Sequence, residues 1–103
     1  MSNFNLNKVI LGGRLTADPE LKQTPQGVAV TSFSIAVNRK GKDAQTDFIN
    51  CVAWRKQAEN IAKYCVKGTQ VAAEGRIQTR SYDHTDGTKR YVTEIVCDNV
   101  TFL

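Results

Sequence analysis

The chain has few of the residues that build metal centres. Its 103 residues include one histidine, His84, and three cysteines, Cys51, Cys65 and Cys97, which form no CxxC pair. His84 is far from all three cysteines in the sequence, so the spacing of zinc ligands is absent. The cysteines lie in apolar or periodic stretches. The sequence therefore predicts three reduced core thiols, no metal and no cofactor.

Catalytic motifs are equally scarce. His84 has no nucleophile nearby, and we interpret His84 and Asp86 as residues of a hairpin loop. The carboxylates are scattered, without the grouping that a two-metal nuclease needs, and neither a P-loop nor a GxGxxG motif is present. We therefore predict that the protein is not an enzyme and has no catalytic residue.

Long apolar runs, repeats and low-complexity segments are also missing. No apolar stretch could span a bilayer, and residues 1–7 do not resemble a signal peptide, so we expect a cytoplasmic protein without membrane contact. With 41% hydrophobic and 23% charged residues, the chain is expected to form one domain over residues 1–103. The net charge of +4 permits a polyanionic partner without proving one.

Five segments alternate with the period of a β-strand. They are residues 8–15, 28–39, 47–54, 70–82 and 89–102, with a short extension at 20–24. Gly12 and Gly13 interrupt the first and predict a bulge or a sharp bend. In that strand Lys8, Ile10 and Arg14 share the face opposite the apolar residues.

Residues 55–66 change to the helical period. Ala58, Ile61, Ala62 and Cys65 follow the spacing of one helical face, and Gly68 is expected to end the helix. Three strands, one helix and two strands is the order of a five-stranded OB-fold barrel with its helix between strands three and four. A two-layer α+β sheet with the same order remains an alternative.

One face of the third strand is aromatic. Ile49, Cys51 and Ala53 take the side expected inside the barrel, and the other side carries Phe48, Asn50, Val52 and Trp54. Because every nucleic-acid base has a π-face, exposed rings can stack bases without choosing among them. The alternative is that the strand is inverted and both rings belong to the core.

The fourth strand combines arginines with an aromatic ring. Val71, Ala73, Gly75 and Ile77 form the face expected inside, and the outer face carries Glu74, Arg76, Gln78, Arg80 and Tyr82. Guanidinium groups pair with phosphates and stack on bases, although a simple solvated face is the alternative reading. Further cations could extend a phosphate track along the sheet: Lys8, Arg14, Lys22, Arg39, Arg55 and Lys56.

With these features in place, the whole chain resembles the N-terminal domain of bacterial single-stranded-DNA-binding proteins. The stretches that carry the resemblance are, in family order, NKVIL, GRL, DPE, VNR, TDFINCVAWRK, AEN, KG, EGRIQTRSY and YVTE. The forms FINC and RIQTR resemble those of low-GC Gram-positive bacteria and their phages or plasmids.

The resemblance implies an OB-fold subunit that binds and protects single-stranded DNA in replication, recombination and repair, close to the nucleoid. It implies a homo-oligomer, usually a tetramer, with the strand wrapped outside. It also implies base stacking by Phe48, Trp54 and Tyr82. The phosphate contacts that it implies come from Lys8, Arg14, Lys22, Lys56, Arg76 and Arg80.

The sequence departs from the family pattern at several points. Gly41 matches a position that is often aromatic, so we expect one stacking contact fewer, and the loop at 40–46 is short. Gly12 replaces a usual β-branched residue, so the first strand is expected to bend more. Family members usually continue into an acidic tail that recruits replication and repair proteins, and such partners are expected only if a tail follows Leu103.

Two rival functions remain on the sequence alone. One is an OB-fold interaction module that has lost DNA binding, and the other is an OB-fold nuclease. The missing carboxylate cluster counts against the nuclease.

Overall fold

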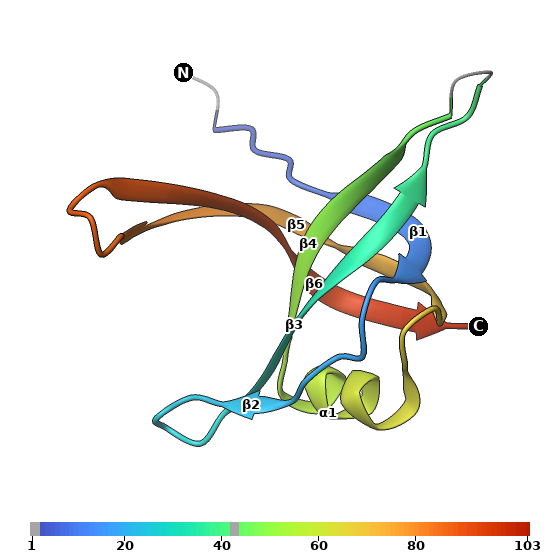
Figure 1. The fold of residues 1–103 in the computed structure, drawn as a ribbon, viewed down its shortest axis with the longest axis horizontal. Coiled ribbons are helices and arrows are strands. Elements are labelled where there is room, and N and C mark those ends of the chain that lie inside the picture. The colour runs from blue at the N-terminus through green and yellow to red at the C-terminus, as the bar shows by residue number, and fades with distance from the viewer. Residues whose placement is uncertain (1–2, 42–43) are drawn as a thin grey trace.

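The structure, a computed structural model, describes residues 3–41 and 44–103. Its elements are β1 (Val9–Leu15), β2 (Lys22–Gln23), β3 (Ala29–Asn38), β4 (Thr46–Trp54), α1 (Arg55–Tyr64), β5 (Gln70–Asp83) and β6 (Lys89–Phe102). The strand order is β1-β5-β6-β4-β3-β2, and β1 also pairs with β3. That pairing joins the five long strands into a ring, so the predicted OB-fold class is confirmed and the two-layer alternative is excluded (Figure 1).

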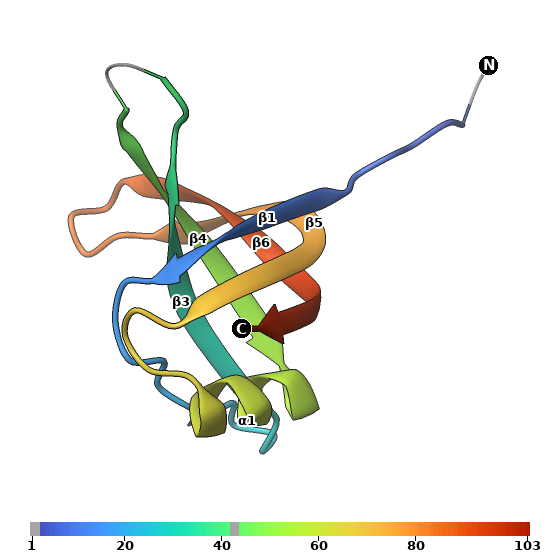
Figure 2. The same ribbon diagram turned by 90° about the vertical axis from the view of Figure 1, so that its right-hand side faces the viewer.

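The first strand closes the ring by changing partners. It pairs with β5 from Val9 to Arg14, and with β3 at Arg14 and Leu15 (Figure 2). The register between β1 and β5 is continuous, so of the bulge or sharp bend expected at Gly12 and Gly13 the bulge is excluded. The register shift lies instead in the pairing of β5 with β6, between Glu74 and Gly75.

The helix α1 packs against one end of the barrel (Figure 1). Ala58 and Ile61 are buried, as their spacing predicts, and Ile61 belongs to the main hydrophobic core. The helix ends at Tyr64 because Cys65 is already extended, two residues earlier than expected. Gly68, with a φ of +89°, does not end the helix, and it lies in the turn closed by the Thr69 N–H and the Val66 carbonyl.

The strands β5 and β6 continue beyond the barrel as a two-stranded arm, residues 77–94 (Figure 1). Ile77 was expected inside but is 45% exposed, because here the sheet has left the barrel and has no core to cover. At the root of the arm, the Asn7 amide donates to the Ile77 carbonyl at 2.7 Å and accepts from the Ile77 N–H at 2.8 Å.

The three cysteines are free thiols in the core, as the sequence predicts. A hydrogen bond to Cys97 and burial raise the pKa of the Cys51 thiol, and burial raises the pKa of Cys65. Within residues 3–41 and 44–103, no group of three or more histidine, cysteine or acidic side chains could hold a metal ion. The helix in the same residues is not long and apolar enough to cross a membrane.

Candidate nucleic-acid interface

The strand β4 exposes its aromatic face. Cys51 and Ala53 are at most 1% exposed in the core, whereas Phe48 is 66% and Trp54 42% exposed. The alternative of an inverted strand is therefore excluded. Val52 shares the face of Trp54 but is only 6% exposed, because it lies in a hollow of that face beneath other side chains.

The junction between β4 and α1 sets the position of the indole. Trp54 is extended, with a φ of −123°, and the next residue, Arg55, has a φ of 59°. This left-handed conformation costs a residue other than glycine about 1 kcal/mol or more. It lets the helix begin directly after the strand, so that Ala58 faces the core while Trp54 stays on the outer face.

A groove separates the arm from β3 and β4. It consists of hollows of about 350 Å³ and about 400 Å³, which share Ser32, Arg80 and Glu94. We call it the arm groove. The first hollow is also lined by Val30, Val52, Trp54 and Gln78, and the second by Thr16, Ala17, Phe33, Ser34, Asn50, Cys51 and Val92. Trp54 and Arg80 therefore line the same hollow, although Trp54 precedes the helix in the sequence and Arg80 follows it.

Half of the eight predicted phosphate-binding cations form ion pairs with carboxylates. The pairs are Lys8–Glu74 at 3.0 Å, Arg39–Asp47 at 2.9 Å, Arg76–Asp98 at 3.0 Å and Arg80–Glu94 at 2.9 Å. A paired cation offers less net charge to a phosphate than a free one, because its carboxylate repels the same phosphate. Pairing therefore divides the predicted cations into two groups.

Among the four ion-paired cations, Arg39 makes the most hydrogen bonds to its carboxylate partner. Its Nε donates to one Asp47 carboxylate oxygen at 3.0 Å and its Nη2 to the other at 2.9 Å. These hydrogen bonds hold the pKa of Asp47 below its usual range, and the carboxylate raises the pKa of Arg39. The two-point contact fixes the guanidinium at the base of the β3–β4 loop.

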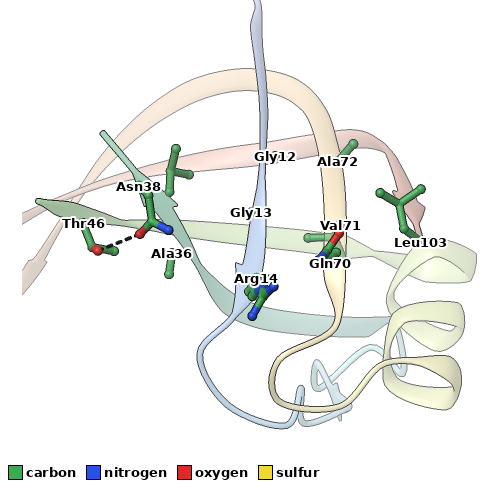
Figure 3. A pocket seen from close by; sticks show the side chains of 11 residues that line it. Gly12, Gly13, Arg14, Ala36, Asn38, Thr46, Gln70, Val71, Ala72 and Leu103 are labelled. Carbon is green, nitrogen blue, oxygen red and sulfur yellow. Dashed lines mark hydrogen bonds between the residues drawn. The ribbon is translucent and has the colours of Figure 1, made fainter. Parts of the chain in front are cut away.

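The other four cations, Arg14, Lys22, Arg55 and Lys56, are exposed and form no ion pair with any described residue. Arg14 lines a further hollow of about 560 Å³ beside β1 (Figure 3). Asn38 and Thr46 line it too, joined by a 2.8 Å hydrogen bond from the Thr46 hydroxyl to the Asn38 side-chain oxygen. This hollow offers one full positive charge and polar groups.

The structure brings only part of the predicted site together. Trp54 and Arg80 meet in the arm groove, whereas Phe48 and Tyr82, exposed at 66% and 46%, line neither of its hollows. The sequence reasoning missed Glu94, whose partner on the next strand depends on register. Tyr91, which is 77% exposed on the arm, was not predicted either. The sequence offered only one indication of it, an aromatic residue within a predicted strand.

Residues 6–103 match the single-strand binding protein family. The single-stranded DNA-binding protein of Halalkalibacterium halodurans is 56% identical over 102 residues, which cover 95% of this chain and 61% of that protein. The protein of the same name from Bacillus cereus is 54% identical, with 95% and 60% covered. Single-stranded DNA-binding protein 1 of Lactococcus lactis is 54% identical, with 95% and 68% covered. The chain thus spans about three fifths of the length of the first two.

Proposed function

The chain belongs to the single-strand binding protein family, and on that premise we propose that it binds and protects single-stranded DNA without selecting a sequence. Such binding would serve replication, recombination and repair. A family name that describes binding also agrees with the prediction that the protein is not an enzyme. The three free thiols suit a reducing compartment, so we place this activity in the cytoplasm.

The observation that carries the proposal is the exposed Trp54 in the arm groove. A ring that is 42% exposed beside the buried floor residue Val52 has lost part of its contact with water without being sealed in the core. A flat base can cover the remaining face, and one such stack contributes about 1–3 kcal/mol. Phe48 and Tyr82, on the outer faces of β4 and β5, are proposed to stack further bases.

Seven of the eight predicted cations, all except Arg80, are proposed to follow the phosphates of the same strand. We assign the larger share to Arg14, Lys22, Arg55 and Lys56, whose charges no described carboxylate neutralises. The paired cations Lys8, Arg39 and Arg76 would have to share or release their carboxylates first. Arg80 differs from these three, because the side chain of its partner Glu94 is only 11% exposed.

A direct test titrates fluorescently labelled oligo-dT with the protein and follows its anisotropy. Oligo-dA should bind as well, since stacking tolerates every base, while a hairpin duplex of the same length should bind much more weakly. Absence of binding to either single strand at low salt would refute the proposal and favour an interaction module. A loss of labelled strand length during incubation with Mg²⁺ would favour a nuclease.

We further propose that the protein acts as a homo-oligomer, a tetramer by resemblance to its family. Exposed apolar side chains near β1 support self-association, because Leu6 and Ile10 are 79% and 69% exposed. Several grooves joined in one assembly would raise the effective concentration of each further contact along a long strand. Light scattering with and without long oligo-dT measures the mass of the assembly, and a monomer in both conditions would refute this proposal.

A further inference from the structure

The pair of Arg80 and Glu94 has a distinctive place in the arm groove. Both side chains line both hollows, so the pair lies where the two hollows meet. Among the described lining residues, Arg80 is the only cation and Glu94 the only anion. The charge at the centre of the groove is therefore close to zero, although the groove lies on a basic protein.

The two partners differ in their exposure. The side chain of Arg80 is 51% exposed, and that of Glu94 only 11%. The Arg80 Nε donates to a Glu94 carboxylate oxygen at 2.9 Å. The carboxylate thus lies close to the floor and holds the guanidinium by one edge, which leaves a planar group half open to the groove beside Trp54.

We propose that Arg80 is a base-stacking residue and not a phosphate ligand: Glu94 holds its guanidinium as a flat, neutralised surface on which a base lies, next to the base on Trp54. This inference rests on the proposed binding of single-stranded DNA. It changes the role predicted for Arg80 and gives Glu94 a role as a positioning residue.

The burial of Glu94 is the reason for this assignment. A phosphate that took Arg80 away would leave a carboxylate that is 11% exposed without its cation, and a buried unpaired charge is costly. A stacked base makes no such demand, because it covers the face of the guanidinium and leaves the Nε–carboxylate bond intact. Arg76 differs, because Asp98 is 60% exposed and water can solvate it after a phosphate takes its partner.

The deciding variant is the double exchange Arg80→Gln with Glu94→Gln, which leaves the net charge unchanged. Affinity for labelled oligo-dT is measured over a series of salt concentrations. We expect affinity to fall about tenfold, the effect of one lost stack, while the log–log salt slope stays at the wild-type value. A phosphate ligand would behave differently, because its loss would flatten the slope by about 0.7.

Arg76→Gln with Asp98→Asn is the matched control, since it removes an exposed ion pair on the same sheet face without changing the net charge. Here the slope should flatten by about 0.7, as for one lost phosphate contact. Arg80→Lys keeps the positive charge and can keep an ion pair with Glu94, but lysine has no planar group on which a base could stack. We expect it to lose as much affinity as the double exchange, and wild-type affinity in Arg80→Lys would overturn the proposal.

Glu94→Gln gives an independent test in which Arg80 remains. The freed cation should then attract a phosphate, so the salt slope should become steeper by about 0.7. Thermal unfolding of each variant checks the fold, and if the double exchange does not fold, Arg80→Lys and Glu94→Gln decide the question. No binding of wild-type protein to oligo-dT would refute the proposed function itself. Normal wild-type binding with an unchanged affinity in the double exchange would refute this inference alone.

Discussion

Gly13 faces the Ala36 carbonyl so closely that a Cβ atom at Gly13 would lie 2.1 Å from that oxygen. The contact marks the point where β1 leaves β5 and joins β3. Gly13→Ala should therefore destabilise the protein by about 3 kcal/mol, since a backbone carbonyl cannot move away as a flexible side chain can. Denaturant unfolding measures the change.

Gly12→Ala is the control for this prediction. A Cβ there would meet only the Val71 carbonyl oxygen, at an ordinary 3.5 Å. Its stability should stay within about 1 kcal/mol of the wild type, because replacing glycine mainly restricts the unfolded chain. Equal destabilisation by both alanines would contradict the idea that barrel closure requires a glycine at position 13.

Trp54, the one tryptophan of the chain, should report binding through its own fluorescence. A base stacked on the indole is expected to quench its emission when oligo-dT is added. In anisotropy titrations with a labelled strand, Trp54→Ala should weaken binding about tenfold, and Trp54→Phe should retain most of the affinity. Tyr64→Ala removes a ring that is 61% exposed on α1, away from the groove, and should leave binding unchanged.

A two-point contact with a carboxylate should keep a cation out of the salt dependence of binding. Lys56→Gln with Glu59→Gln keeps the net charge and removes an unpaired lysine, so it should flatten the log–log slope by about 0.7. Arg39→Gln with Asp47→Asn removes a cation that already has a two-point carboxylate contact, and should leave the slope unchanged. The prediction fails if the two exchanges flatten the slope equally.

Acid should loosen the tip of the arm. Hydrogen bonds from the Thr88 hydroxyl and N–H, then contacts with His84 and Arg90, hold the pKa of Asp86 below its usual range. Because the folded pKa is the lower one, this stabilisation is present above the unfolded pKa and is lost as the pH falls through the folded value. In NMR titrations, the Thr88 amide should shift with a midpoint below that of an ordinary aspartate.

The variant Asp86→Asn checks the origin of that shift. Without the carboxylate, the acid-dependent change at the Thr88 amide should disappear. A midpoint at or above the usual aspartate range in the wild type would show that these hydrogen bonds do not favour the charged form.

The strands were predictable because each strand of a closed barrel has one face toward solvent and one face toward the core. Alternation in residues 47–54 placed Cys51 and Ala53 inside and Trp54 outside, and the structure confirms both. The same logic was wrong for Ile77, because the arm has no interior and alternation there carries no information about burial. The end of the helix was missed because Gly68 belongs to a separate turn.

The residues of the candidate site could be chosen from the sequence, but their pairing could not. Arg80 and Tyr82 share one parity with every other outward residue of β5. That Arg80 meets Glu94 follows from the register of β5 with β6, and sequence alternation does not contain that register. For the same reason, the sequence could not predict that half of the eight cations already have a carboxylate partner.

Most of the arm lies in water: residues 76–91 are all exposed, and only Val92 and Glu94 are partly covered. Folding therefore places few demands on the side chains in this stretch, since there is almost no buried volume for them to fill. Substitutions, and even insertions at the turn, can accumulate there during evolution while the barrel stays intact. Changes confined to this one hairpin can thus alter what the groove holds while the barrel keeps its fold.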